Sequence, residues 1–111
     1  MRWFRLAADQ GLADAQYNLG WMYSDGTGVL KDAAEAVRWY RLAADQGDAE
    51  AQSNLGGMYA RGAGVLKDDA EAVRWYRLAA DQGLAAAQGN LGLMYANGSG
   101  VPRDRDRKSV V

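Results

Sequence analysis

Apolar residues recur at helical spacing along the chain, and the whole pattern repeats every 36 residues. Trp3, Trp39 and Trp75 are each 36 positions apart. The segment WYRLAADQG that begins at Trp39 returns unchanged from Trp75. The same step relates further sets of residues: Gly11, Gly47 and Gly83; Tyr23, Tyr59 and Tyr95; Val29, Val65 and Val101. A fixed period of this length indicates stacked units whose neighbours bury one another's apolar faces.

The second half of each unit has the pattern of an amphipathic helix. Ala36, Trp39, Tyr40 and Ala43 fall at i, i+3, i+4 and i+7, which puts them on one face. The charged residues of the segment lie away from this stripe, which is typical of a solvated face. This segment contains almost no helix breakers, so we predict one continuous helix with a buried aromatic stripe.

Polar residues and glycines mark both ends of this helix. Asp32 with Glu35 three positions later predicts a capping box, in which Asp32 accepts from an orphan amide and Glu35 reaches back. Gly47 is placed to end the helix in a left-handed conformation. Within the helix, Arg41 and Asp45 are spaced for a weak ion pair worth about 0.3 kcal/mol.

A shorter helix opens each unit. We expect these first helices at 13–25, 49–61 and 85–97, with the buried stripe of the first formed by Ala15, Leu19, Met22 and Tyr23. Gly20 lies beside this stripe, where a missing side chain lets another helix approach closely. A glycine then ends each helix, and a G-x-G-V turn leads to the next capping residue.

These patterns predict an all-α chain with one repeat array over residues 1–102. The array contains half a helix at 1–10, repeats at 12–47 and 48–83, and the first helix of a third repeat at 84–98. The pattern fails beyond Asp104, because Arg107 stands where the capping box needs glutamate and Val111 stands where tryptophan is expected. We therefore predict that residues 103–111 form a poorly ordered tail.

The repeat resembles a known family. The pattern A-x-x-x-L-G-x-x-Y-x-x-G-x-G-V-x-x-D, followed by A-x-x-W-Y-x-x-A-A-x-x-G, is similar to the Sel-one-like repeat, a relative of the tetratricopeptide repeat. The match covers roughly residues 3 to 104. The resemblance implies an α/α superhelix, a right-handed solenoid of helix-turn-helix repeats. It also implies a scaffold or adaptor whose concave side, lined by first helices, is available to a protein or peptide.

Composition narrows the range of partners. Apolar residues make up 49% and charged residues 24% of the 111 residues, which is typical of a soluble folded protein. The net charge of −1 provides no field that would attract nucleic acid or an anionic membrane. No apolar run approaches the roughly 20 residues of a membrane span, and no signal peptide is evident. We expect neither nucleic-acid nor membrane binding, and these features favour a cytoplasmic location.

The chemistry of the chain argues against catalysis. The sequence contains no histidine and no cysteine, the commonest general base and a common metal ligand. The G-x-G-V loops lack the strand and the lysine-serine pair of a phosphate-binding loop. We therefore predict a non-catalytic chain without a cofactor or a metal.

Differences between units indicate where a partner would bind. Residues 31–47 and 67–83 differ only at Ala33 against Asp69, whereas 12–26 and 48–62 differ at six of 15 positions. The varied positions of the first helix span only about 100° of its circumference. Residues that pack between units must repeat, while residues that face a partner are free to differ. The predicted partner-binding residues are Tyr17, Asn18, Trp21, Ser24, Ser53, Asn54, Gly57, Arg61, Asn90, Leu93 and Asn97.

Three alternatives stay open at this point. The varied positions are also explained if they are simply exposed, and the asparagine series Asn18, Asn54 and Asn90 suits either structural bonds or a bound peptide backbone. Tyr17 and Trp21 form either an exposed aromatic anchor or a cover for the half helix at 1–10. The function could instead be self-association, with head-to-tail stacking of the incomplete ends into a homo-oligomer.

Overall fold

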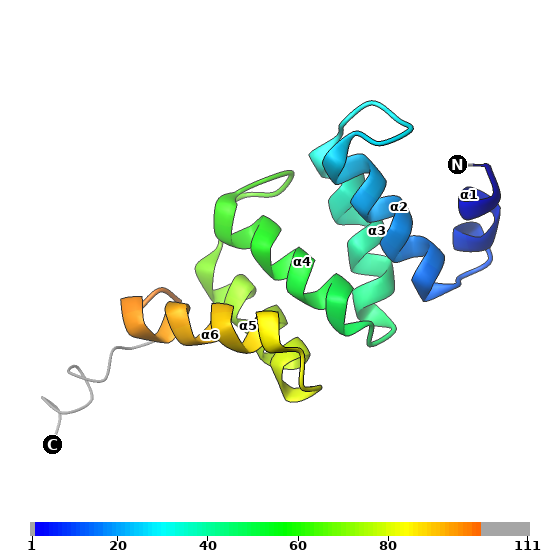
Figure 1. Ribbon diagram of the computed structural model, residues 1–111. Coiled ribbons are helices and arrows are strands. Elements are labelled where there is room, and N and C mark those ends of the chain that lie inside the picture. The colour runs from blue at the N-terminus through cyan, green and yellow to red at the C-terminus, as the bar shows by residue number, and fades with distance from the viewer. Residues whose placement is uncertain (1, 101–111) are drawn as a thin grey trace, which may run out of the picture.

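The protein is described here by a computed structural model that covers residues 2–100. Within that range it consists of helices joined by short loops, without strands: α1 (Arg2–Asp9), α2 (Ala13–Asp25), α3 (Ala33–Asp45), α4 (Ala49–Arg61), α5 (Asp69–Asp81) and α6 (Ala85–Asn97). The predicted all-α fold is confirmed, and the three first helices have the expected bounds. Figure 1 shows the helices following one another from α1 at one end to α6 at the other. The predicted tail at 103–111 lies outside the described residues.

The core runs through the hairpins, as the repeat pattern requires. Leu19 and Leu55 are fully buried on the first helices, and Trp39 is 2% exposed on α3. Trp39 packs with Ala8 of α1 and with Ala15 and Leu19 of α2, so one side chain ties three helices together. The corresponding cluster around Trp75 joins α3, α4 and α5. Each unit therefore completes its core only with residues of its neighbour.

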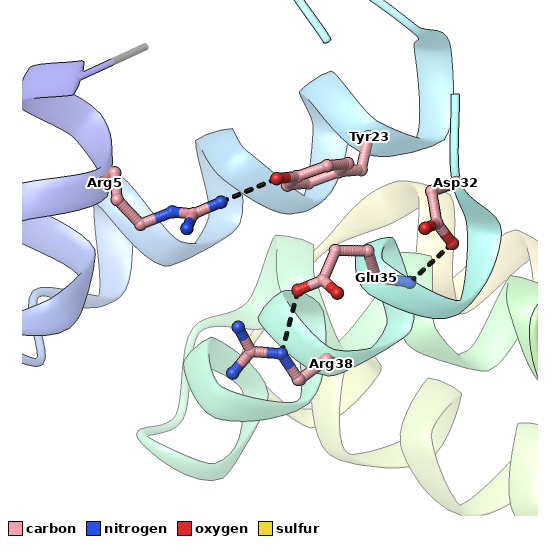
Figure 2. A network of polar contacts seen from close by, with 5 residues as sticks. All are labelled: Arg5, Tyr23, Asp32, Glu35 and Arg38. Carbon is pink, nitrogen blue, oxygen red and sulfur yellow. Dashed lines mark hydrogen bonds and ion pairs between the residues drawn. The ribbon is translucent and has the colours of Figure 1, made fainter. Parts of the chain in front are cut away.

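The predicted capping box is present only in part. The Asp32 carboxylate accepts from the Glu35 amide at 3.1 Å, but the Glu35 side chain pairs with the Arg38 Nε at 2.9 Å instead of reaching back (Figure 2). The reason is that the Asp32 amide already donates to the Tyr23 carbonyl at 2.9 Å. Because the Asp32 amide already has an acceptor, the Glu35 side chain has no free amide to cap. Asp68 and Glu71 behave in the same way.

The expected ion pair between Arg41 and Asp45 is wrong. Arg41 instead donates to the Tyr59 hydroxyl of the next unit and lies over its ring, 5.6 Å from the centroid. Arg5 makes the equivalent bond to Tyr23 at 2.6 Å, shown in Figure 2. A contact of arginine with both the hydroxyl and the face of a tyrosine outcompetes an exposed ion pair, which contributes little in water.

Glutamines also join successive units. The Gln46 side-chain amide donates to the Gly11 carbonyl at 2.9 Å and to the Gln16 side-chain oxygen at 2.8 Å. Gln82 makes the same two bonds one unit later. Gln16 is itself buried and donates to the Ala8 carbonyl, so this buried glutamine is satisfied by residues of the neighbouring units.

A glycine on each first helix allows the second helix to pack closely. A Cβ added at Gly20 would lie 2.6 Å from the Tyr40 ring, and one at Gly56 would lie 2.9 Å from the Tyr76 ring. Gly56 would also meet the Ala72 carbonyl at 3.2 Å. Gly92 has no neighbour among residues 2–100 within 4 Å of its added Cβ. The close approach expected from the sequence is thus confirmed in the two complete units.

These glycines predict opposite effects of the same substitution. Gly56→Ala should destabilise the protein by about 1–2 kcal/mol, because the methyl group overpacks a buried ring. Gly92→Ala should stabilise it by up to about 1 kcal/mol, because alanine is the better helix former and meets no obstacle. Chemical denaturation followed by circular dichroism measures both changes. Changes of the same sign would contradict the close-packing role.

Candidate functional site

A polar groove crosses the first helices. It is a cavity of about 310 Å³ to which α2, α4 and α6 each contribute, with tyrosines of α3 and α5 completing its lining. The middle helix α4 contributes the most side chains. The lining residues are Trp21, Ser24, Tyr40, Ser53, Asn54, Gly57, Met58, Arg61, Tyr76, Ala86 and Asn90.

Most of the partner-binding residues predicted from the sequence meet in this groove. They come from three helices that are separated by 36 residues each, and the stack brings their varied faces together. Trp21, 46% exposed, lies at the groove from α2, whereas Ser53 and Gly57 of α4 are buried at its base. The predicted residues in the groove are Trp21, Ser24, Ser53, Asn54, Gly57, Arg61 and Asn90.

Four predicted residues lie elsewhere. Asn18 lines a separate cavity beside α1, and Leu93, 63% exposed, lines no described cavity. Asn97 is exposed at the end of α6. Tyr17 is half-buried and packs on Tyr40 with ring centroids 5.8 Å apart. The expected exposed pair of Tyr17 and Trp21 is therefore wrong for Tyr17, which belongs to the edge of the core.

The alternative in which Tyr17 covers the half helix at 1–10 is also wrong. Its ring packs with the core cluster that joins α3 and α4, and it does not belong to the cluster that contains Ala8 of α1. Its hydroxyl lies near Glu50 and Asn54 of the next first helix, both of which influence its pKa. Burial raises the pKa of Tyr17, and the nearby Glu50 carboxylate raises it further.

Sequence reasoning missed the tyrosines of the groove. Tyr40 and Tyr76 sit on the apolar stripe of the second helices and are buried, so their pattern predicts core residues only. Each ring packs under a first-helix glycine, and its hydroxyl reaches the groove beyond that helix. The Tyr76 hydroxyl lies 3.5 Å from where a Cβ on Gly57 would stand. The helical spacing of a tyrosine in the sequence does not show whether its hydroxyl reaches a groove or is fully enclosed in the core.

Among residues 2–100, Arg61 is the only charged residue that lines the groove. Its guanidinium lies against Gly57, with Nη1 3.1 Å from an added Cβ there, and Nη2 donates weakly to the Met58 sulfur at 3.5 Å. Burial raises the pKa of Tyr40 to about 12, while hydrogen bonds from Asn54 and Ser24 and the charge of Arg61 oppose the shift. Burial likewise raises the pKa of Tyr76, and Arg61 again opposes it. The arginine is thus electrostatically coupled to both tyrosines.

The raised pKa of Tyr40 predicts a loss of stability in alkali. The unfolded chain releases this proton near pH 10 and the folded chain near pH 12, so the folded state binds more protons between them. The stabilisation is complete below about pH 10 and disappears as pH rises through about 12, for a loss of roughly 2 kcal/mol. Denaturation midpoints of the parent and of Tyr40→Phe at pH 8 and pH 11.5 test this. The phenylalanine variant should lose less stability, and equal losses would contradict the assignment.

A second, apolar cavity of about 540 Å³ lies between α1 and α2. Trp3, Phe4 and Ala7 of α1 face Ala15 and Asn18 of α2 across it. The corresponding side chains of the complete units are buried by a first helix: Trp39 and Trp75, Tyr40 and Tyr76, and Ala43 and Ala79. The α1 residues that line this cavity therefore correspond to residues that pack against a first helix in the complete units. The lining of the polar groove is different in this respect.

Within residues 2–100, no group of three or more metal-ligating side chains gathers at one place. No helix in that range has the length and apolar character needed to cross a membrane.

The fold and much of the sequence are shared with solved repeat proteins. The chain is 52% identical, with a TM-score of 0.92 over 94% of its length, to c5321, a protective antigen of uropathogenic Escherichia coli strains with an SLR fold. It is 45% identical, with a TM-score of 0.89 over 96% of its length, to a Sel1 repeat protein from Oxalobacter formigenes. Cysteine rich protein B of Helicobacter pylori is 28% identical, with a TM-score of 0.76 over 81% of this chain and 68% of that one.

The chain is shorter than these relatives. It spans 22% of the E. coli antigen and 44% of the Oxalobacter protein. No curated protein matches it. The family described as Sel1 repeat matches residues 1–12, 13–48, 49–84 and 85–109. With the repeat, the helical stack and these matches in agreement, the chain belongs to the Sel1 repeat family.

Proposed function

We propose that this chain is a non-catalytic scaffold that binds an extended segment of another protein in the polar groove. Sel1 repeat proteins typically act as scaffolds for protein–protein interactions. The observation that carries the proposal is that positions which vary between near-identical repeats, among them Trp21, Ser53 and Arg61, gather in one groove. Packing between units explains the residues that repeat. It does not require the particular residues at the varied positions of the groove.

The lining of the groove suits a peptide. Asn54 and Asn90 each offer a donor and an acceptor, and the hydroxyls of Ser24 and Ser53 add further partners for a main chain. Asn54 also lies close enough to Tyr17 and Tyr40 to lower the pKa of both hydroxyls, so its amide is directed toward polar groups of the groove and its edge. Trp21 supplies a large, half-exposed ring at the edge, a residue type enriched at binding hot spots.

Photo-crosslinking and an alanine pair test this proposal. A photoreactive phenylalanine analogue at Ser24 should crosslink to a cellular partner that the same analogue at Leu78 does not capture. With that partner purified, Trp21→Ala should weaken binding about thirtyfold or more, since truncating an aromatic hot-spot residue costs about 2 kcal/mol or more. Leu78→Ala is the matched control, because Leu78 is similarly exposed (41%) but lies on α5 outside the groove. Equal affinity of the two variants would refute the groove as the binding site.

A second function is favoured by a separate observation at the two ends of the stack. Trp3 is 75% exposed, whereas its counterparts Trp39 and Trp75 are buried. At the other end, no atom of residues 2–100 covers Gly92, whereas Gly20 and Gly56 are covered by tyrosines. We propose that a second copy can stack head to tail, with Phe4 of one copy over Gly92 of the other as Tyr40 lies over Gly20. This contact would continue the interface already formed between α2 and α3.

Sedimentation velocity over a range of concentrations tests the stacking. The apparent mass of the unmodified protein should rise with concentration. Trp3→Glu should remain monomeric, because the stacked contact would bury a carboxylate without a partner. Leu66→Glu controls for the added charge, since Leu66 is 90% exposed in a loop away from both ends. A parent that stays monomeric at every concentration would rule the stacking out.

A further inference from the structure

We infer that the groove selects a partner segment carrying an acidic side chain, aspartate or glutamate, which pairs with Arg61. The inference rests on the proposed peptide-binding function and adds the chemistry of the partner. It is drawn from the surroundings of this one arginine and from its position in the repeat.

In the part of the chain that the structure describes, Arg61 is a cation without a paired anion. On the second helices, Arg38 forms an ion pair with Glu35, and Arg74 forms one with Glu71. Within residues 2–100, no carboxylate lies at ion-pair distance from Arg61, and none of the residues lining the groove is acidic. Its one hydrogen bond goes to a thioether sulfur, a weak acceptor that leaves most of the guanidinium donors available.

The groups around Arg61 favour an anion. The hydroxyls of Tyr40 and Tyr76 lie within the influence of its charge. Hydroxyls and side-chain amides of Ser53, Asn54 and Asn90 can also donate to a carboxylate placed beside the guanidinium. Charge-assisted bonds of this kind are about twice as strong as neutral ones, and arginine binds a carboxylate with two parallel bonds.

The cation is specific to the middle unit. The equivalent positions are Asp25 in the first unit and Asn97 in the third, so the packing of a Sel1 hairpin does not require arginine here. An arginine that the stack does not need, facing a cavity lined in part by varied residues, is a candidate for specificity toward the partner.

The position of Arg61 favours a side chain over the carboxylate at the end of a chain. The groove extends from Trp21 and Ser24 on α2 to Ala86 and Asn90 on α6, and Arg61 belongs to α4 between them. A segment that ended at Arg61 would leave one side of the groove empty. A segment that passes across all three helices fills both sides and presents a side chain at the centre.

Small capped amino acids provide the probe. N-acetyl-aspartate N-methylamide and its asparagine counterpart have nearly the same shape and differ in charge, and N-acetylglycine represents a chain-end carboxylate. Each is titrated into the uniformly nitrogen-15-labelled full chain, following the Trp21 indole, the Gly57 amide and the side-chain amides of Asn54 and Asn90. The aspartate probe should bind at least about tenfold more tightly than the asparagine probe, as expected for one charge-assisted pair.

Two variants complete the test. Arg61→Gln should abolish the preference for aspartate, whereas Arg74→Gln, which removes the same charge from the exposed face of α5, should keep it. If Arg61→Gln does not fold, the comparison of probes on the parent decides alone. Equal binding of aspartate and asparagine at the groove would overturn the inference and leave peptide binding standing. Tighter binding of N-acetylglycine would overturn the side-chain assignment, and an absence of shifts with every probe would count against both proposals.

Discussion

Replacing Trp39 with alanine is expected to lower the free energy of unfolding by about 4 kcal/mol. Trp39 is 2% exposed and packs with Ala8, Ala15 and Leu19 on two other helices. Its removal leaves a cavity that three helix backbones cannot close without losing their other contacts. Domains of this size are stable by only about 5–15 kcal/mol, so the loss is a large part of the total.

The same repeat position supplies the control. Trp3 is 75% exposed, so Trp3→Ala should change the stability by less than about 0.5 kcal/mol. Guanidinium denaturation followed by far-ultraviolet circular dichroism gives both values. The comparison separates the effect of burial from the effect of the residue type, because the two tryptophans have equivalent places in their helices. Similar losses in the two variants would mean that the core does not lie between the hairpins as described.

The second large effect is expected at Gly64, where alanine should cost about 3 kcal/mol. The backbone there has φ of +73°, a conformation in which a side chain costs about 1–2 kcal/mol. An added Cβ would also lie 2.4 Å from the Ala33 carbonyl oxygen and 2.9 Å from the Ala34 nitrogen. Because both obstacles are backbone atoms, the loop must move away from the start of α3, and the contact between units is lost.

Gly28 isolates the contribution of the contact. It is the equivalent glycine of the first unit, with φ of +77°, and an added Cβ there meets nothing within 4 Å. Gly28→Ala should therefore lower the free energy of unfolding only by the cost of a side chain at positive φ, about 1 kcal/mol. The difference in unfolding free energy between the Gly64 and Gly28 variants measures the packing of the loop on the preceding unit. Thermal or chemical unfolding of the pair decides. Losses that match at the two glycines would show that the loop contact contributes nothing.

Most residues of the groove could be predicted from the sequence because the repeats of this one chain can be compared with one another. Near-identical units made the variation at Trp21, Ser53 and Arg61 visible, and the helical period placed it on one face. The prediction was less accurate for Tyr17 and Asn18. Both lie toward a neighbouring element, Tyr17 toward Tyr40 and Asn18 toward the cavity beside α1. A helical wheel gives the direction of a residue around one helix and not what stands opposite it.

The sequence by itself determined the helices, the bounds of the first helices and the central residues of the core. Those properties are local or periodic: the capping role of Asp32, the glycines after each helix and the stripe that includes Trp39 all follow from spacing within a few turns. The tertiary structure alone decided which of these residues also act between units. Gly64 reads as an ordinary turn glycine and Tyr40 as an ordinary core residue. Only the stacking sets the first against the backbone of α3 and brings the hydroxyl of the second to the groove, because the distance between units depends on how all their side chains pack together.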